Sequence, residues 1–296
     1  MKMKKKIFLV IALLVLITAC NFPFFKEEEP ENIFDQPAQT LTAMFAAFPT
    51  PTAAATGQSA TAAVQASSTA IPSATAANDQ RGAQQVVAKY LSKKPVLDGD
   101  WGDWKQSTLA YPAYYVVYGL KAWENDSDCE GSFILGWDES FLYVGVKVKD
   151  DTYVQNASDE LLFRGDSIEL LIDTDLAGDF HTASLNEDDY QIGIAPGRGS
   201  INGPKEAYLW YPISKKGSIT DQIDITSTST AGIYRLEVRI PWSVLEITPQ
   251  KGMRLGFEFS VSDNDNPAEN VQQTLISNIP THGFLDPTTW GEMILD

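Results

Sequence analysis

Segments with a two-residue period recur through the second half of the chain and constrain its fold more than any other feature. In "FLYVGVKV" the side chains at 142, 144, 146 and 148 are all apolar and fall on one face of an extended strand. The segments "YRLEVRI" and "RLGFEFSVS" alternate in the same way, and clusters of Gly, Pro and Asp separate such segments. Long helical periodicity is absent from the sequence. The pattern predicts an all-β fold, an antiparallel β-sandwich.

Residues 161–179, "LLFRGDSIELLIDTDLAGD", contain a strand of the same kind with a charge in its middle. Ile168, Leu170 and Ile172 fall on one face, which we expect to lie in the core. Glu169 falls on the other face. It is either a solvated strand carboxylate or a hydrogen-bond acceptor in a binding site.

The same segment ends in a D-x-D-x-x-G-D pattern formed by Asp173, Asp175 and Asp179. Clustered carboxylates need a cation or solvent to relieve their repulsion, and Ca²⁺ prefers such oxygen ligands. The pattern lacks the spacing and final glutamate of an EF-hand. We therefore expect a structural Ca²⁺ near these three residues. Asp263 and Asp265 in "SDNDNP" form a second candidate, or an Asx-rich turn.

The N-terminus has the features of an export signal. Four lysines in the first six residues precede an apolar run at 7–17, which is short for a membrane span. Small residues then precede Cys20. This arrangement resembles the lipobox of bacterial lipoproteins and implies a signal peptide at 1–19 and lipidation of Cys20; the alternative is an ordinary signal peptide with a chance cysteine. We expect an exported protein, lipid-anchored on the extracytoplasmic face of the cell membrane or at the cell surface.

Composition changes sharply along the chain. No charged residue occurs between Asp35 and Asp79, where Ala, Thr, Ser, Gln and Pro dominate. Such a segment has too few large apolar side chains to form a core, so residues 20–85 are predicted to be a disordered linker between the lipid and the fold. Residues 86–296 are rich in aromatic side chains and have the length of one β-sandwich domain.

Charge and cysteine content exclude several classes of function. The net charge is −17, and removal of the four signal lysines leaves 18 basic against 39 acidic residues, or −21. Nucleic acid would be repelled by this surface. Cys129 is the only cysteine after Cys20, so no intrachain disulfide forms if Cys20 is acylated. With two histidines, His181 and His282, a transition-metal cluster is not expected.

Six stretches, taken in order, resemble carbohydrate-binding module family 9 and its wider DOMON-like relatives. They are "KPVLDGDWGDW", "GWDESFLYVGVKVKDD", "FRGDSIELLIDTD", "YRLEVRIPWSVL", "GMRLGFEFSVSDND" and "FLDPTTWGEMIL". The resemblance implies a jelly-roll-like β-sandwich that binds saccharide without cleaving it, often with structural Ca²⁺. Such modules usually hold polysaccharide near an enzyme, so the resemblance implies either capture for secreted glycoside hydrolases or adhesion to the substrate, and we expect a monomer.

The resemblance also implies a ligand site. Family members with established sugar binding clamp a sugar between two tryptophans, and the matching positions here are Phe163 and Phe284. A strand glutamate of the family falls on Glu169, and an arginine of the neighbouring strand falls on Gln191. Phenylalanine retains stacking but offers a smaller face and no N–H donor, which implies weaker binding or a different sugar.

Other interpretations stay open from sequence alone. Phe163 and Phe284 fit core packing as well as sugar stacking, and Trp210 and Tyr211 fit either an extended platform or the core. DOMON-like relatives include haem-binding electron-transfer domains, although no pair of axial ligands is evident. A structural envelope protein that has lost its sugar site is the remaining alternative. No sequence motif for a catalytic nucleophile or a phosphate loop occurs, and His181 and His282 are typical of surface or turn positions.

Overall fold

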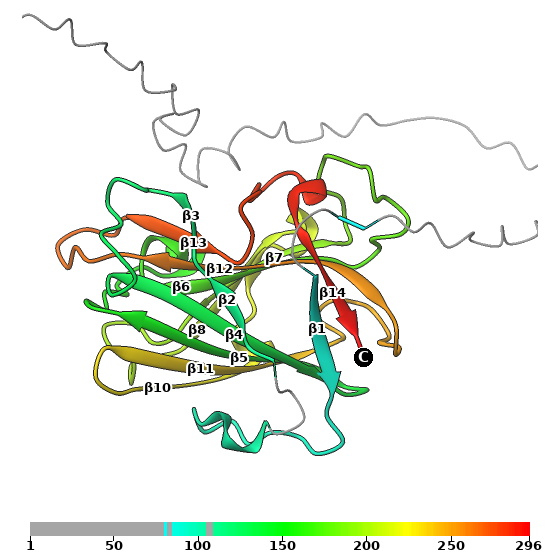
Figure 1. The fold of residues 1–296 in the computed structure, drawn as a ribbon, viewed down its shortest axis with the longest axis horizontal. Helices are drawn as coiled ribbons and strands as arrows, with labels where there is room; N and C mark the ends of the chain where they lie inside the picture. Colours follow the sequence, from blue (N-terminus) through cyan, green and yellow to red (C-terminus); the bar gives the residue numbers. More distant parts are fainter. Residues whose placement is uncertain (1–79, 82–84, 105–108) are drawn as a thin grey trace, which may run out of the picture. The chain divides into compact units, whose positions relative to one another are not determined.

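The computed structural model describes residues 80–81, 85–104 and 109–296, which form two β-sheets packed on each other (Figure 1). In the larger sheet β14 and β13 lie along one edge of β12, β3 lies beside β13, and β6, β7, β8 and β9 follow on the other edge. The smaller sheet has the order β10-β11-β5-β4, with β2 also paired to β4.

The strands are Gln85–Tyr90 (β1), Tyr111–Ala113 (β2), Tyr115–Tyr118 (β3), Cys129–Trp137 (β4), Phe141–Asp150 (β5), Ser167–Asp173 (β6), Asp189–Ala195 (β7), Glu206–Tyr211 (β8), Gly217–Ser218 (β9), Asp224–Ser229 (β10), Ile233–Pro241 (β11), Arg254–Asp263 (β12), Thr274–Ser277 (β13) and Gly291–Leu295 (β14). Short 3₁₀ helices cover Trp101–Asp103 (η1), Asp159–Arg164 (η2), Ile213–Lys215 (η3), Thr220–Gln222 (η4) and Pro287–Thr289 (η5).

The predicted all-β sandwich is confirmed, with one departure from antiparallel pairing. β1 runs parallel to β14 through its first four residues and parallel to β4 through its last two. It therefore joins the two sheets along one side. Arg81, within the segment predicted as linker, is buried and bonds Asp173 and Glu292, so contacts of the folded domain begin before residue 86.

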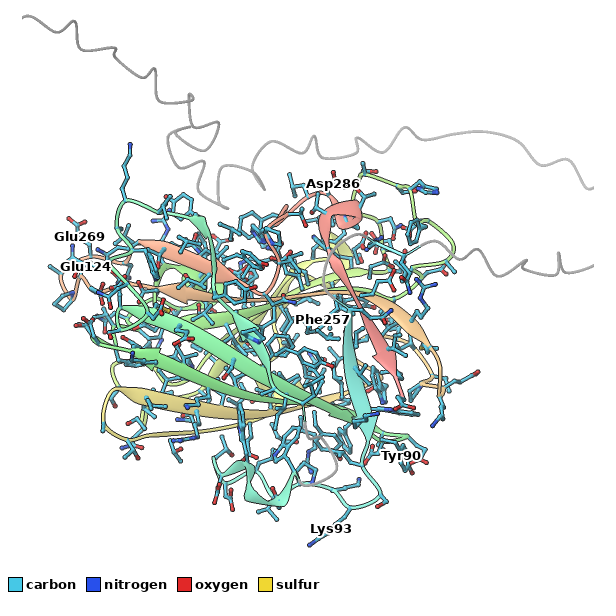
Figure 2. The ribbon with its side chains drawn as sticks, in the orientation of Figure 1. Tyr90, Lys93, Glu124, Phe257, Glu269 and Asp286 are labelled. Atoms are coloured by element: carbon cyan, nitrogen blue, oxygen red, sulfur yellow. The ribbon has the colours of Figure 1, made fainter. Side chains whose placement is uncertain are left out.

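The core lies between the sheets and is built from the predicted alternating positions. The alternating apolar residues of β5, β11 and β12, which the two-residue period assigned to one face of each strand, are all buried in one cluster. Phe133 of β4 crosses the interface, and its ring centroid lies 5.8 Å from that of Phe257 and 4.5 Å from that of Phe259, both on β12 (Phe257 is labelled in Figure 2). Stacked aromatic rings of this kind add to the apolar burial that holds the sheets together.

The Asp-Gly turn and tryptophan of "KPVLDGDWGDW" are fixed by one buried carboxylate of the smaller sheet. Glu237 of β11 accepts hydrogen bonds from the backbone N–H groups of Asp98 and Gly99 and from Nε1 of Trp104. Gly99 has φ of 82°, and a Cβ there would lie 2.5 Å from Cγ2 of Thr228, so only glycine fits.

Along β6 the outer face of the larger sheet, which points away from the core, is buried as well. All seven residues of β6 are buried, including those that alternate with Ile168, Leu170 and Ile172. The helix η2 packs against β6, β7, β8 and β12 and covers part of this face. The solvated alternative for Glu169 is therefore wrong: its side chain is 0% exposed.

The predictions for the N-terminus fall outside the described residues. These are the signal peptide at 1–19, lipidation at Cys20 and nearly all of the linker at 20–85. Within the ranges that the structure does describe, no helix is both long and apolar enough to cross a membrane.

Candidate functional site

Glu169 and Gln191 lie next to each other on the outer face of the larger sheet. In the pairing of β6 with β7, Leu171 stands opposite Gln191, and Glu169 stands opposite Gly193. Both side chains are buried, and in the described part of the chain neither the carboxylate oxygens of Glu169 nor the amide atoms of Gln191 make a hydrogen bond of ordinary length and angle, although the amide of Gln191 is close enough to favour the charged carboxylate. Buried polar groups are normally paired, so this pair is prepared for a ligand or for water.

Three further side chains complete this group. Ser260 of β12 stands directly opposite Glu169 in the sheet, and Glu258 lies two residues earlier on the same face. His282, from the loop before η5, bonds Oε1 of Glu258 through Nδ1, and Ser277 donates to that oxygen at 2.8 Å. Among the described residues, Oγ of Ser260, Oε2 of Glu258 and Nε2 of His282 have no partner.

We call these five residues the outer-face cluster: Glu169, Gln191, Glu258, Ser260 and His282. Sequence reasoning found only the first two. Alternation in "RLGFEFSVS" places Glu258 and Ser260 on one face of the strand, and this pattern could have indicated both residues. The pairing of His282 with Glu258 depends on the path of a loop, so no local pattern could have indicated it. Of the two positions expected for His282, surface or turn, the loop position is the one observed, and its side chain is only 6% exposed.

Burial and neighbouring charges shift the titration of this cluster. Burial raises the pKa of Glu169 to about 7; the charge of His282 opposes this shift, Glu258 adds to it, and Gln191 opposes it. Burial lowers the pKa of His282, but the adjacent Glu258 and then Glu169 outweigh burial, so the net shift is upward. The histidine therefore keeps its second proton to a higher pH than an ordinary imidazole does.

The two predicted aromatic residues lie at the margins of the cluster. Phe284 is partly buried, and its ring stands perpendicular to that of His282 with 4.3 Å between the centroids. Phe163, on η2, is only 3% exposed and packs edge-on against Trp210 at 6.1 Å. Among the described residues no ring contact joins Phe163 to Phe284. Trp210 is fully buried, which fits its core-packing alternative.

The closing segment of the chain fixes the loop that holds His282 and Phe284. Asp286 caps η5 by accepting hydrogen bonds from the backbone N–H and the hydroxyl of Thr288 (Asp286 is labelled in Figure 2). Trp290 is fully buried and donates from Nε1 to the carbonyl of Gly283 at 2.8 Å. Trp290, the tryptophan of the "DPTTWG" stretch, thus fixes the backbone at Gly283, which lies between His282 and Phe284 in the chain.

A separate group of aspartates spans the two sheets at one end. Carboxylate oxygens of Asp150 at the end of β5 and of Asp263 and Asp265 at the end of β12 lie within 4.8 Å of one another. We call these three residues the aspartate cluster; Asp265 also lies that close to Asp128 and Asp151. Glu124 and Glu269, labelled in Figure 2, lie on neighbouring loops.

The aspartate cluster fits a hard cation. Asp150 and Asp263 are 5% and 1% exposed, and each member of the cluster has one oxygen that finds no donor in the described part of the chain. Burial above all raises the pKa of Asp150 to about 7, that of Asp263 to about 8 and that of Asp265 to about 6, with the other aspartates adding to each shift. A bound Ca²⁺ would supply the positive charge that offsets the repulsion between these carboxylates.

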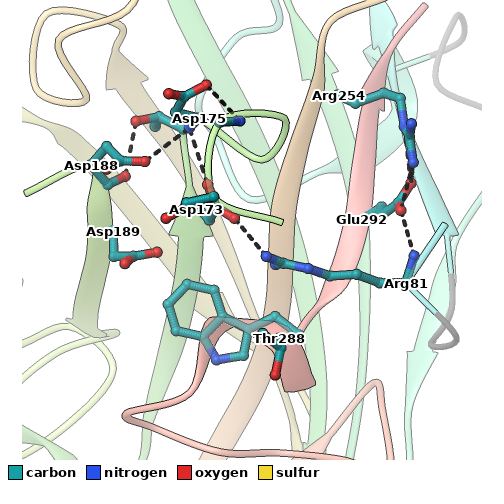
Figure 3. Close-up of polar contacts among 12 residues, drawn as sticks. Arg81, Asp173, Asp175, Asp188, Asp189, Arg254, Thr288 and Glu292 are labelled. Carbon is teal, nitrogen blue, oxygen red and sulfur yellow. Dashed lines mark hydrogen bonds and ion pairs between the residues drawn. The ribbon is translucent and has the colours of Figure 1, made fainter. Parts of the chain in front are cut away.

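The predicted calcium residues Asp173, Asp175 and Asp179 are only partly brought together. Figure 3 shows Asp173 and Asp175 beside Asp188. Asp173 and Asp179 meet Asp188, which precedes β7, within 4.8 Å. Asp175 instead uses its backbone N–H to bond Asp173 and Asp188 and its carboxylate to accept from Gly178. A cation already lies beside this group, because Nη2 of Arg81 bonds Oδ2 of Asp173 at 2.8 Å.

Two packed sheets with the core between them place this chain among the β-sandwich domains. It belongs to the family described as Carbohydrate family 9 binding domain-like, whose model matches residues 97–296. The resemblance seen in the sequence is thereby confirmed. No curated protein matches the chain in sequence.

Solved structures share the fold at low identity. A family 9 carbohydrate-binding module from Caldicellulosiruptor kristjanssonii in complex with cellotriose is 22% identical, with a TM-score of 0.54 over 72% of this chain and 94% of that one. A family 9 module from the same organism in complex with glucose is 22% identical, with a TM-score of 0.53 over 72% of this chain and 96% of that one. A protein from Bacteroides uniformis ATCC 8492 is 11% identical, with a TM-score of 0.52 over 72% of this chain and all of its own.

Proposed function

We propose that this protein is a non-catalytic saccharide-binding module whose ligand contacts the outer-face cluster. One observation carries the proposal: seven buried polar atoms of five side chains find no partner among the described residues, in a chain of this family. Leaving such atoms unpaired costs about 1–3 kcal/mol each. A polyhydroxylated ligand offers donors and acceptors at close spacing and would satisfy several of them at once.

Each side chain has a distinct role in this proposal. The carboxylate of Glu169 accepts hydrogen bonds from two sugar hydroxyls, while Gln191 and Ser260 each donate one hydrogen bond and accept another. His282, whose Nδ1 bonds Glu258 and whose pKa is raised by that neighbour, donates from Nε2 to a sugar oxygen in its protonated form. Phe284 and Phe163 supply apolar faces for the ring. Because Glu169 and Gln191 are buried, neighbouring side chains must move before a sugar reaches them.

A structural role without sugar binding is the second candidate. It is favoured by the burial of Phe163, whose ring packs against Trp210 rather than facing solvent. The two candidates differ in one measurement, which is whether the purified domain binds any saccharide.

Titration against glucose-, xylose-, mannose- and N-acetylglucosamine-based oligosaccharides is expected to reveal at least one ligand. Phe284→Ala is expected to weaken that binding by about tenfold, as the loss of one aromatic contact would, and Phe163→Ala combined with Phe284→Ala by more. Calorimetry gives the affinities, and thermal unfolding checks that the variants fold. Unchanged affinity in the double variant would exclude this site, and no binding across the panel would favour the structural role.

We further propose that the module is exported and anchored through Cys20, where it holds polysaccharide for secreted glycoside hydrolases. The lipobox-like sequence before Cys20 supports the anchor. In a bacterial host, metabolic labelling with an alkyne fatty acid is expected to mark the wild-type chain and not Cys20→Ala. Equal labelling of both chains would contradict the anchor.

We also propose a structural Ca²⁺ at the aspartate cluster rather than at Asp173. The cluster has three orphaned carboxylate oxygens among the described residues, whereas Asp173 already has the guanidinium of Arg81. A divalent ion held by Asp150 on one side and by Asp263 and Asp265 on the other would tie β5 of the smaller sheet to β12 of the larger one.

A further inference from the structure

One row of directly paired residues crosses the larger sheet and passes through the outer-face cluster. Residues that stand opposite each other in antiparallel strands point to the same face. The row runs from β3 to β8 through Tyr115, Ser277, Ser260, Glu169, Gly193 and Tyr208. The cluster is thus the middle of a longer line, and its β3 end is aromatic.

Tyr115 at that end is joined to a second tyrosine. The ring centroids of Tyr114 and Tyr115 lie 4.3 Å apart with an interplanar angle of 34°, and their hydroxyls are hydrogen-bonded at 2.9 Å. The backbone N–H of Tyr114 donates to the carbonyl of Ser277 at 3.1 Å, which holds the pair against β13 (β3 and β13 are labelled in Figure 1). The two rings therefore have a fixed position before any ligand arrives.

The pair is unusual for its exposure. Tyr114 is 52% exposed, whereas the polar residues of the same row are buried. Packing alone gives no reason to hold two large rings together at a solvent-facing edge, and aromatic rings with hydroxyl groups are typical of surfaces that bind ligands. Ser277, which faces Tyr115, also donates to Glu258, so the pair borders the outer-face cluster directly.

The distance between Glu169 and the pair Tyr114–Tyr115 determines which ligands can contact both. Tyr115 is three strands away from Glu169, which corresponds to about 14 Å at the usual spacing of about 4.8 Å between strands. A monosaccharide held at Glu169 does not extend that far, whereas an oligosaccharide lying across the strands does. We propose that Tyr114 and Tyr115 form a second stacking subsite for a distal unit of the same oligosaccharide, an inference that rests on the proposed function.

The test compares ligand lengths in one homologous series. Glucose and cello-oligosaccharides of two to six units are titrated calorimetrically against wild type, Tyr114→Ala, Tyr114→Phe and Tyr90→Ala. Tyr90 is a matched control, since it is a partly exposed tyrosine at the end of β1, away from the row. Tyr114 is exposed, so its alanine variant is expected to fold, and thermal unfolding checks this.

We expect wild-type affinity to rise with ligand length, and Tyr114→Ala to lose about three- to tenfold for the long members while glucose binding is unchanged. Tyr114→Phe and Tyr90→Ala should resemble wild type. Equal loss for glucose and the hexaose, or no loss for either, would overturn the subsite and leave the proposed function intact. A wild type that binds no member of the series would overturn the subsite, and the wider oligosaccharide panel then decides whether the proposed function fails with it.

Discussion

Adding Ca²⁺ to chelator-treated protein at pH 8 is expected to raise its thermal unfolding midpoint by about 5–10 °C, which is the shift for about 2.7 kcal/mol of binding in a domain of this size. The physical reason is the aspartate cluster. The pKa values of Asp150, Asp263 and Asp265 are about 7, 8 and 6 in the folded state, above the ordinary value of 3.8. Without metal these groups favour folding while protonated, and that contribution is lost as the pH rises from about 4 to about 8.

The Ca²⁺ effect should therefore depend on pH. At pH 5 the three carboxyls retain their protons in the folded state, so the ion competes with protons and the midpoint shift is expected to be small. Differential scanning calorimetry at both pH values, with and without Ca²⁺, measures the difference. An equal shift at pH 5 and pH 8 would contradict the role given to these carboxyls.

Two variants separate the possible calcium sites. Asp263→Asn is expected to abolish the Ca²⁺-dependent shift, because it removes one charge from the most buried ligand of the cluster. Asp179→Asn is the matched control from the group beside Arg81, and it should respond to Ca²⁺ as wild type does. The reverse outcome would place the ion at Asp173 and Asp179, as the sequence pattern alone suggests.

The sequence predicted the local features of this molecule well and the long-range ones poorly. Ile168, Leu170 and Ile172 were assigned to the core from their period, and they lie there because alternation is a property of a single strand. The same period could not show that the face of Glu169 is covered, since the helix η2 and a distant loop provide the cover. A polar position on a strand looks the same in sequence whether water or another segment lies over it.

Both acidic groups show the same limit. The spacing of Asp173, Asp175 and Asp179 suggested three ligands, but pairing of β6 with β7 brings Asp188 to Asp173 and Asp179 and leaves Asp175 as a turn residue. Asp150 and Asp263 are far apart in the chain and on different sheets, so no local motif could join them. Family resemblance supplied the positions of Glu169 and Gln191, which the register then placed side by side.

Glu169→Gln is expected to stabilise the protein at pH 9 and to weaken saccharide binding. Burial raises the pKa of Glu169 from 4.5 to about 7, so the folded state favours the neutral acid. The contribution of this group to stability is fully present below about pH 4.5 and is lost as the pH rises through 7. A neutral amide does not titrate, and the variant should therefore gain up to about 3 kcal/mol relative to wild type between pH 4 and pH 9. Denaturant unfolding at the two pH values measures this change.

The effect on binding should have the opposite sign. At pH 8 the wild-type carboxyl group is mostly ionised and accepts hydrogen bonds from sugar hydroxyls. Replacing this charged acceptor by an amide is expected to cost about ten- to a hundredfold in affinity. Wild-type affinity should also fall between pH 8 and pH 5 as Glu169 takes up a proton. Calorimetric titration of the tightest oligosaccharide at both pH values checks both statements.

Glu237→Gln is the matched control, because Glu237 is equally buried but has its oxygens bonded to Asp98, Gly99 and Trp104. Burial raises the pKa of Glu237 as well, but the hydrogen bonds from Trp104, Gly99 and Asp98 oppose that shift. Glu237→Gln should therefore gain less stability at pH 9 than Glu169→Gln, because it also weakens satisfied hydrogen bonds, and it should leave saccharide affinity unchanged. If Glu169→Gln behaved in the same way, Glu169 would be a structural carboxylate like Glu237. If it gains stability while it loses affinity, the wild-type protein retains an unpaired buried charge at a cost to its own folding, and ligand binding is the reason for that cost.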